Sequence, residues 1–296
     1  KNKKGNPVTY TVTSSITLKN PTRTGYTFDG WDTVIPSTMP AENITINAKW
    51  EANEYAIVYD TDGGTAVGDT SATYDAEATL AAAPTKTGYV FKGWKLGDTT
   101  YEAGATVKNL AAEGTVTVKA VWEANTYTVT FDKNDEAATG AMGEQSFTYD
   151  VAENLDELGF SKEGWHFVEW NTAADGNGTS YSDNAEVVNL TADVDGKVTL
   201  YAIWTINLYD VTFKFNSVTG EEITVTRNDV PHGTAFSALA LPTADEGYAV
   251  TYYNGAVAEP ENNTHHYNFT AWENAVDEIT ADVTFVAQYE AEQHKY

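Results

Sequence analysis

A phrase of aromatic residues that returns along the chain limits what this sequence can fold into. It reads G-Y-T-F-D-G-W from Gly25 and G-Y-V-F-K-G-W from Gly88, and the related G-W-H-F-V-E-W begins at Gly164. After these three copies the chain reaches A-K-W, A-V-W and A-I-W in turn, each of which closes a short segment with an aromatic residue, and a fourth segment closes with A-Q-Y. Self-similarity of this kind is the signature of tandem structural units. The chain is therefore predicted to be an array of small, similar domains.

The closing aromatic residues set the predicted boundaries, and we name the units the first to the fourth repeat. They are expected over residues 1–50, 51–122, 123–204 and 205–296. The first repeat is in register from Tyr10, which corresponds to Tyr74, but lacks the opening strand of the others. The fourth is divergent, and Tyr296 resembles the first residue of a further unit. The sequence thus reads as a window from a longer array, or, alternatively, as a chain whose first repeat receives a strand from a neighbouring subunit.

Alternating side chains open each complete repeat and predict β-strands. Tyr127, Val129 and Phe131 lie on one face with threonines between them, the period-2 pattern of a half-buried antiparallel strand. Turn residues follow, as in D-T-D-G-G from Asp60, so a strand, a turn and a second strand are expected. Residues 76–83 could form one or two helical turns that end before Pro84. The predicted fold class is mainly β, in small α+β units joined into an elongated array.

The phrase itself is predicted to be a core strand. Tyr26 and Phe28 share a face and should point into the core, whereas Trp31 has the opposite parity. Either Trp31 faces the other side of the sheet, or a bulge at Gly30 returns it to the same face. The glycine that leads each phrase should adopt a positive φ. These glycines are Gly25, Gly88, Gly164 and, in P-T-A-D-E-G-Y, Gly247.

The tryptophans decide between two classes of function. Exposed indole rings could stack on sugars, whereas rings that recur in every unit are expected in the core or at a junction. Recurrence favours the core here. All eight fall at repeat positions: Trp31, Trp94, Trp170 and Trp272 at one, Trp50, Trp122 and Trp204 at another, and Trp165 in place of the phrase tyrosine.

The segments between repeats are short. Only residues 51–54 separate Trp50 from Tyr55, and only residues 123–126 separate Trp122 from Tyr127, without a Gly/Ser tract. Neighbouring repeats are therefore expected to be stiffly coupled and arranged end to end. Compact units of this size measure about 25–30 Å, so four in line would reach on the order of 100 Å.

Composition excludes several classes of partner. The net charge of −26 would repel a phosphate backbone, so nucleic acid is not expected as a partner. No apolar run reaches the length of a membrane helix, and no membrane insertion is expected in this segment. The chain has no cysteine, which removes disulfides and thiol chemistry. Hydrophobic residues make up 42% of the chain, enough to fill a core.

Patterns for catalysis or metal binding are weak. Two short acidic loops, from Asp60 and from Asp193, lack the later acidic ligand of a calcium loop and are interpreted as turns. No phosphate loop, nucleophile elbow or dinucleotide motif occurs. We therefore predict no catalytic residue, cofactor or metal site, and the sequence does not identify ligand-binding residues. The histidines include one adjacent pair, which on a strand would point to opposite faces: His166, His232, His265, His266 and His294.

Taken together, these motifs resemble a known family. The order Y-x-V-x-F-D, then P-T-K-T-G-Y-x-F-x-G-W, then V-T-V-K-A-V-W resembles the Listeria/Bacteroides repeat, the internalin B-type repeat of bacterial surface proteins. The second and third repeats carry the likeness best, and the fourth carries it more loosely. The resemblance implies β-grasp-like, β-rich domains, no catalytic residues, and a place in stalks or adhesins outside the cell.

The function expected from the sequence is a non-enzymatic extracellular stalk that presents a distal module at the cell surface. It could also contribute to adhesion, with a host or cell-surface glycan or protein as partner. Two alternatives remain open. One is a carbohydrate-binding array that uses exposed aromatic side chains, and the other is a subunit of a strand-exchanged filament.

Overall fold

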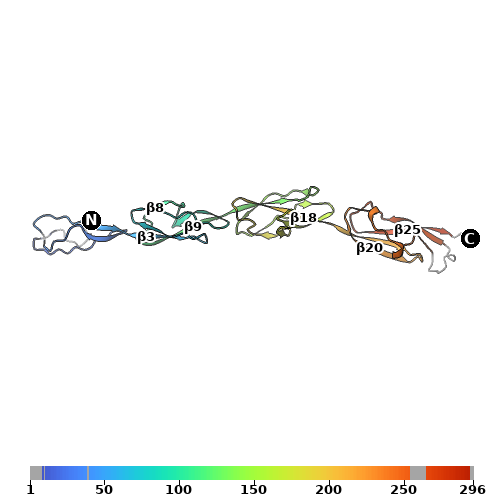
Figure 1. Ribbon diagram of the computed structural model, residues 1–296, viewed down its shortest axis with the longest axis horizontal. Helices are drawn as coiled ribbons and strands as arrows, with labels where there is room; N and C mark the ends of the chain where they lie inside the picture. The colour runs from blue at the N-terminus through green and yellow to red at the C-terminus, as the bar shows by residue number, and fades with distance from the viewer. Residues whose placement is uncertain (1–8, 10, 39, 254–264, 294–296) are drawn as a thin grey trace. The chain divides into compact units, whose positions relative to one another are not determined.

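The computed structural model describes residues 9, 11–38, 40–253 and 265–293 (Figure 1). The predicted positions of Tyr10, His294 and Tyr296 lie outside these residues. The chain divides into two compact units. One consists of Lys1–Tyr127, Ser146–Ala152 and Val188–Gly196, and the other of Thr128–Gln145, Glu153–Val187 and Lys197–Tyr296. The third repeat therefore contributes segments to both units.

The second repeat shows the complete fold. Its five-stranded sheet has the order β4-β3-β9-β6-β7, and β5 pairs with β8 in a small second sheet. Its strands are β3 (Glu54–Asp60), β4 (Thr70–Thr73), β5 (Glu77–Thr79), β6 (Tyr89–Leu96), β7 (Thr99–Tyr101), β8 (Thr106–Lys108) and β9 (Gly114–Ala124).

The third repeat has the same strand order. Its large sheet runs β12-β10-β18-β15-β16, with two small sheets, β11-β14 and β13-β17. Its strands are β10 (Thr126–Asp132), β11 (Thr139–Gly140), β12 (Gln145–Thr148), β13 (Glu153–Asn154), β14 (Phe160–Ser161), β15 (Trp165–Asn171), β16 (Ser180–Tyr181), β17 (Glu186–Val187) and β18 (Gly196–Ile206).

The fourth repeat keeps this order as β20-β19-β25-β23-β22, with β21-β24 as the small sheet. Two 3-10 turns, η1 (Phe236–Ala238) and η2 (Ala244–Glu246), are its helical segments in the described residues. Its strands are β19 (Leu208–Asn216), β20 (Glu222–Pro231), β21 (Thr234–Ala235), β22 (Thr251–Tyr253), β23 (His265–Glu273), β24 (Glu278–Ile279) and β25 (Val283–Gln293).

The first repeat is described as a single hairpin, β1 (Tyr26–Trp31) with β2 (Ala48–Ala52). The pairing of Phe28 with Trp50 in this hairpin matches that of Phe91 with Trp122 in β6 and β9. β1 and β2 are therefore the counterparts of β6 and β9. The mainly β class and the tandem organisation predicted from the sequence are confirmed.

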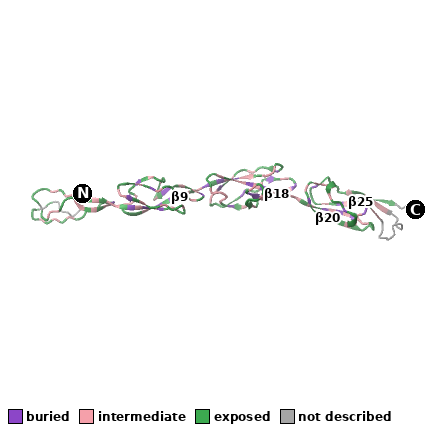
Figure 2. Ribbon diagram, viewed as in Figure 1, coloured by how far each residue is buried: buried purple, intermediate pink, exposed green. Residues whose placement is uncertain are grey.

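Each opening strand has two different neighbours. β3 pairs antiparallel with β4, as expected for a strand, a turn and a second strand, and parallel with β9 over Tyr55↔Gly114 to Asp60↔Lys119. Sequence alternation does not reveal the parallel neighbour, because the period is two in both arrangements. Both strands contribute to the core, since Ile57 and Val118 are completely buried. Figure 2 shows such buried stretches in purple along the chain.

A bulge in the phrase strand brings its tryptophan to the core face. The register of β6 against β9 shifts between Phe91 and Gly93, and the Phe91 and Trp94 rings lie 5.0 Å apart on one side. The other three repeats shift at the same place. Glu169 and Ala271 occupy the bulge in two of them, so glycine is not required. The bulge interpretation of Trp31 is thus confirmed.

Three predictions about local structure were wrong. Residues 76–83 form no helical turn, because Glu77–Thr79 extends as β5 to pair with β8. The first phrase aromatic, Tyr26, is half-buried and packs on Tyr74 of the second repeat instead of filling its own core.

The third error concerns the fourth repeat, where Gly247 does not lead the phrase strand. That strand is β23, and its Phe269 pairs with Tyr289. His266 therefore stands where the other repeats have glycine. The pattern G-Y after Pro242 imitates the phrase, but Gly247 follows η2 with a φ of 90°.

Candidate functional site: the junctions between repeats

A single asparagine joins each repeat to the next. Asn53 lies between β2 and β3, Asn125 between β9 and β10, and Asn207 between β18 and β19. In the first–second junction the Asn53 N–H donates to the Gly25 carbonyl at 2.9 Å, and the Asn53 carbonyl accepts from the Tyr74 N–H at 2.8 Å. The backbone of the linker is thus bonded on one side to the preceding repeat and on the other to the following one.

The same backbone relay recurs in the other junctions. Asn125 donates to the Gly88 carbonyl and accepts from the Tyr149 N–H, both at 2.8 Å. Asn207 donates to Gly164 at 2.8 Å and accepts from His232 at 2.9 Å. Because both polar groups of every linker residue are used, the connection is not a free tether.

The phrase glycine is needed where the next repeat packs. Gly88 has a φ of 77°, and a Cβ added there would lie 2.2 Å from a ring carbon of Tyr149. At Gly164 the added atom would lie 2.0 Å from the His232 ring. The predicted positive φ is confirmed, and close approach of an aromatic ring is a second reason for glycine that the sequence did not indicate.

Two junctions also carry a hydrogen bond from a phrase tyrosine to an aspartate of the next repeat. The Tyr26 hydroxyl donates to Asp75 at 2.6 Å, and the Tyr89 hydroxyl donates to Asp150 at 2.7 Å. An asparagine holds each carboxylate from its own repeat: Asn189 accepts from the Asp150 N–H at 2.6 Å and donates to its carboxylate at 2.7 Å. We call the pair formed by a phrase tyrosine and such an aspartate the tyrosine–aspartate lock.

Hydrogen bonds set the charge state of the lock. The Tyr26 hydroxyl, and after it Asn109, lower the pKa of Asp75. Asn189, and after it Tyr89, lower the pKa of Asp150. In return, the bond to Asp150 raises the pKa of Tyr89. Donors that bind an ionised carboxylate favour the charged form, so both locks operate as phenol-to-carboxylate bonds near neutral pH.

The third–fourth junction keeps the relay and changes the side chains. Trp165 replaces the phrase tyrosine, His232 replaces the packing tyrosine, and Gly233 stands where the others have aspartate. The lock therefore cannot form there. The Nδ1 atom of His232 is buried and has no hydrogen-bond partner. His166 instead bonds to the Asn207 side chain at 2.8 Å.

In the first three repeats a basic residue lies over the first aromatic residue of the phrase. The Arg23 guanidinium is 3.5 Å from the centre of the Tyr26 ring, and Lys162 Nζ is 3.6 Å from that of Trp165. Lys86 lies over Tyr89 in the same way, at 4.3 Å. Cation–π contacts of this geometry are favourable. The sequence already showed these basic residues, as the second position of T-R-T-G and T-K-T-G, but did not indicate that they lie over the aromatic ring.

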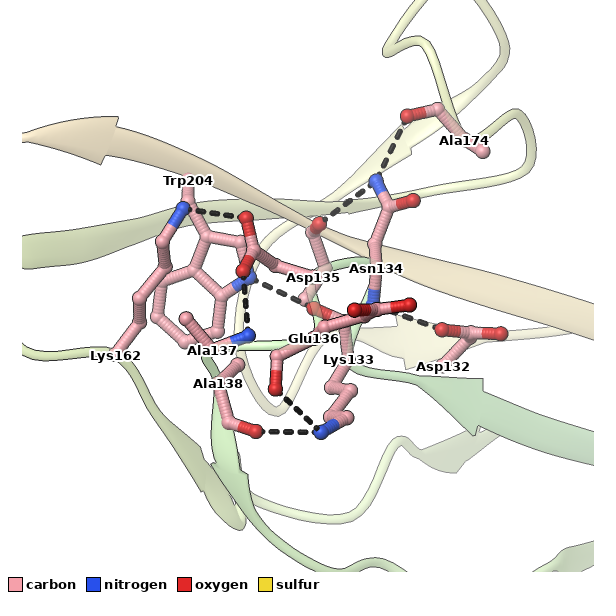
Figure 3. A network of polar contacts seen from close by, with 11 residues as sticks. Asp132, Lys133, Asn134, Asp135, Glu136, Ala137, Ala138, Lys162, Ala174 and Trp204 are labelled. Atoms are coloured by element: carbon pink, nitrogen blue, oxygen red, sulfur yellow. Dashed lines mark hydrogen bonds and ion pairs between the residues drawn. The ribbon is translucent and has the colours of Figure 1, made fainter.

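The closing aromatic of each complete repeat is tied to the end of the opening strand. Trp122 Nε1 donates to the Thr61 carbonyl at 3.0 Å, and Trp204 Nε1 donates to the Lys133 carbonyl at 2.9 Å (Figure 3). In the fourth repeat the Tyr289 hydroxyl accepts from the Asn216 N–H at 3.1 Å. We call this bond the closing latch.

The loop that receives the latch in the third repeat is itself well bonded (Figure 3). Lys162 contacts the Asp135 carboxylate at 2.7 Å, and Asn134 donates to the Ala174 carbonyl at 2.7 Å. Lys162, before the Ala137 N–H, lowers the pKa of Asp135. The loop therefore has structural partners for its charged side chains.

The residues considered for metal binding have similar roles. Asp62 pairs with Lys119 at 2.9 Å, and the Asp60 carboxylate accepts from the Asp62 N–H, as in a turn. His266 contacts Glu292 at 3.2 Å. Across the described part of the chain, no group of three or more His, Asp or Glu side chains is placed to hold a metal ion.

None of the eight tryptophans is exposed, and all eight lie among the described residues. Trp94 and Trp170 are completely buried, and the others are half-buried. Phe91 lies between Trp94 and Trp122 with ring distances of 5.0 and 5.5 Å. The prediction that the tryptophans pack in the core or at junctions agrees with these positions.

Comparison with known sequences accounts for the recurring geometry. The sequence model of the Listeria-Bacteroides repeat domain matches residues 1–49, 55–121 and 127–203. The chain belongs to this repeat family. The match breaks off at each asparagine junction, so the repeat of the family coincides with the unit between two junctions.

Three relatives are similar to this chain. A protein named "Putative Gly-rich membrane protein" from Evansella cellulosilytica is 28% identical over 90% of this chain and 29% of its own length. A second protein from that organism, named as a membrane protein, is 30% identical over 63% of this chain and 29% of its own length. Internalin H of Listeria monocytogenes is 36% identical over 30% of this chain and 18% of its own length. The chain spans less than a third of each relative.

The two Evansella relatives are thus membrane proteins by name. In the part of this chain that the structure describes, no helix has the length and apolar character needed to cross a membrane.

Proposed function

We propose that this chain is a non-enzymatic spacer segment of a cell-surface protein, which presents a distal module outside the cell and contributes to adhesion. The observation that carries the proposal is the backbone relay through one asparagine at each of three junctions. A linker whose N–H and C=O are both bonded restricts the repeats that it joins, as a spacer requires. Membership of a tandem-repeat family and the names of the relatives support a surface location.

The charge of the chain fits the same role. A net charge of −26 keeps like surfaces apart and favours solubility at high local density. Adhesion would then depend on a limited surface or on the distal module, with a host or cell-surface glycan or protein as the partner. The absence of exposed indole rings favours the spacer over a sugar-binding array built on tryptophans.

Small-angle scattering tests the spacer directly. We expect a maximum dimension on the order of 100 Å or more and a rod-like pair-distance distribution, because compact repeats of this size measure about 25–30 Å. Asn125→Gly/Asn207→Gly, which removes the side-chain contacts of two linkers, is the matched variant for added flexibility. A compact particle near 60 Å, whose dimension does not respond to these changes, would overturn the proposal.

A second candidate function, strand exchange through the first repeat, is favoured by one observation. Ile46 corresponds to Val118 of β9, which is completely buried, but Ile46 is only half-buried, and neither Ile44 nor Ile46 lies in a strand. In the described residues β2 pairs only with β1. An edge of this kind can accept a strand from a second copy.

Sedimentation velocity tests the exchange. Strand exchange predicts oligomers that grow with concentration and that dissociate when a synthetic peptide of residues 54–60 is added. A scrambled peptide of the same composition is the control. A monomer at all concentrations that does not bind the peptide would exclude this candidate.

A further inference from the structure

The strand by which the chain enters a complete repeat lies beside the strand by which it leaves. In the second repeat these are β3 and β9, which run parallel over Tyr55↔Gly114 to Asp60↔Lys119. In the fourth they are β19 and β25, parallel over Val211↔Val283 to Lys214↔Val286. β10 and β18 are neighbours in the same place in the third repeat.

This arrangement determines how tension would act on a repeat. Because the two strands are parallel, the start of β3 and the end of β9 lie at opposite ends of their shared ladder. Tension applied before Glu54 and after Ala124 would slide the strands along each other. Hydrogen bonds that run across the strands are then loaded together, whereas separation from one end would break them in turn.

We infer that each complete repeat is a mechanical clamp that bears load along the chain. The inference rests on the proposed spacer function for the source of the load, but the clamp itself follows from the strand order. Sliding would also pull core side chains past one another. Ile57 and Val118 in the second repeat, like Phe213 and Phe285 in the fourth, are completely buried on the two clamp strands.

The closing latch reinforces the clamp. Trp122, near the end of β9, is bonded to the Thr61 carbonyl just after the end of β3. Lys119 on β9 pairs with Asp62 in the same turn at 2.9 Å. Both contacts join the leaving strand to the far end of the entering strand, so they lie across the path along which the strands would slide.

The first repeat provides an internal contrast. β2 has no parallel partner in the part of the first repeat that is described, and Trp50 stands at the position of Trp122. Its hairpin with β1 is antiparallel. We therefore expect it to open at a lower force than any complete repeat.

Single-molecule force spectroscopy on the whole chain tests the clamp. The chain has no cysteine, so two introduced cysteines define the points of attachment uniquely. The variant E54C/E123C loads β3 and β9 in shear. The variant E54C/T115C attaches to the same repeat but pulls the paired starts of the two strands apart.

We expect the shear pair to unfold at a force at least about twofold higher than the other pair at equal loading rate. Opening in shear should release roughly 20 nm of chain, from about 3.3–3.6 Å per residue. Circular dichroism verifies that both variants are folded. Equal forces for the two pairs would overturn the clamp, even if scattering finds an extended chain. A compact particle in scattering would instead overturn the proposed spacer function without contradicting the clamp.

A latch variant provides a second measurement. Trp122→Phe keeps an aromatic ring and removes the donor to Thr61. We expect it to lower the force of the shear pair and leave that of the E54C/T115C pair within error. An equal loss in both geometries would show a general loss of stability and reject the latch as part of the clamp.

Discussion

The second–third and third–fourth junctions have the same backbone and different side chains. In both, the linker asparagine donates to a phrase glycine at 2.8 Å and accepts from the following repeat. Only the second–third junction adds the bond from Tyr89 to Asp150, since Trp165 and Gly233 take these places in the other. The relay and the glycine are therefore the common requirement, and the tyrosine–aspartate lock is an addition.

The largest effect is expected from a change to the common part. Gly88→Ala combines an unfavourable φ with a clash against the Tyr149 ring, and should lower the free energy of junction opening by about 3 kcal/mol. Native-state hydrogen exchange at the Asn125 and Tyr149 amides measures this opening. Gly164→Ala should act similarly at Asn207 and His232.

Gly114→Ala is the control for that prediction. Gly114 has a φ of 78°, but a Cβ there would meet nothing within 4 Å. Only the conformational cost of about 1 kcal/mol should remain. Equal losses for Gly88→Ala and Gly114→Ala would mean that ring approach does not define the junction.

Removing the linker asparagine side chain should destabilise the two junctions by different amounts. Asn125 is 7% exposed and donates to the Ala192 carbonyl at 2.7 Å, so Asn125→Ala leaves that carbonyl unpaired and should cost about 1–2 kcal/mol. Asn207→Ala loses a contact with the exposed His166 side chain and should cost less than about 1 kcal/mol. Exchange at the Tyr149 and His232 amides compares the two. The opposite order would contradict the contrast in burial.

Moving the lock between junctions should have a smaller effect. Gly233 has a φ of 76° and open space at Cβ, and Asp150 adopts a φ of 62° at the matching place. The variant W165Y/G233D should therefore place a phenol beside a carboxylate and slow exchange at the His232 amide severalfold. W165F/G233D, which lacks the hydroxyl, is the matched control. If both variants exchange alike, a hydroxyl–carboxylate bond contributes nothing at this position.

Lowering the pH should produce the smallest difference in stability between the two junctions. The pKa of Asp150 is lowered by Asn189 and Tyr89, so its carboxylate stabilises the folded junction above the ordinary value of 3.8. That contribution disappears as the pH falls through the lower folded value. Protection of the Tyr149 amide, corrected for intrinsic rate, should fall more than that of His232 between about pH 5 and about pH 2. Asp150→Asn should abolish the difference, and its persistence would assign the effect to another group.

The sequence predicted the elements that depend on local pattern. The repeat, the opening strands and the positive φ of Gly88 follow from spacing and residue type, whereas the bulge that returns Trp31 to the core face was one of two alternatives that the sequence left open. The parallel neighbour of β3 could not be predicted, because Tyr55 and Gly114 are brought together only by the completed sheet. The helical turns predicted for residues 76–83 were wrong for the same reason. Pairing with β8 makes Glu77–Thr79 a strand, whatever the helix propensity of the segment.

The sequence predicted only part of the junction. The short linkers and the recurring glycine were visible, but the reason for both lies in a residue of the next repeat. Tyr149 is far from Gly88 along the chain, and nothing in the G-Y-V-F phrase refers to it. In the fourth repeat the match of Gly247 to the phrase failed because β23 begins after an additional segment, with His266 at the glycine position.

The division of each junction between two repeats has a consequence for how such arrays change in length. The glycine lies in the phrase of one repeat, and the residue that packs on it follows β4, β12 or β20 in the next repeat. The second and third repeats therefore each carry a phrase glycine that receives the following repeat and an aromatic residue that packs on the glycine of the preceding one. Recombination can remove or duplicate a whole unit from one linker asparagine to the next. The new junction then again places a phrase glycine of one repeat against the packing aromatic residue of another. Arrays of this kind can grow or shrink by whole units without a new interface having to evolve.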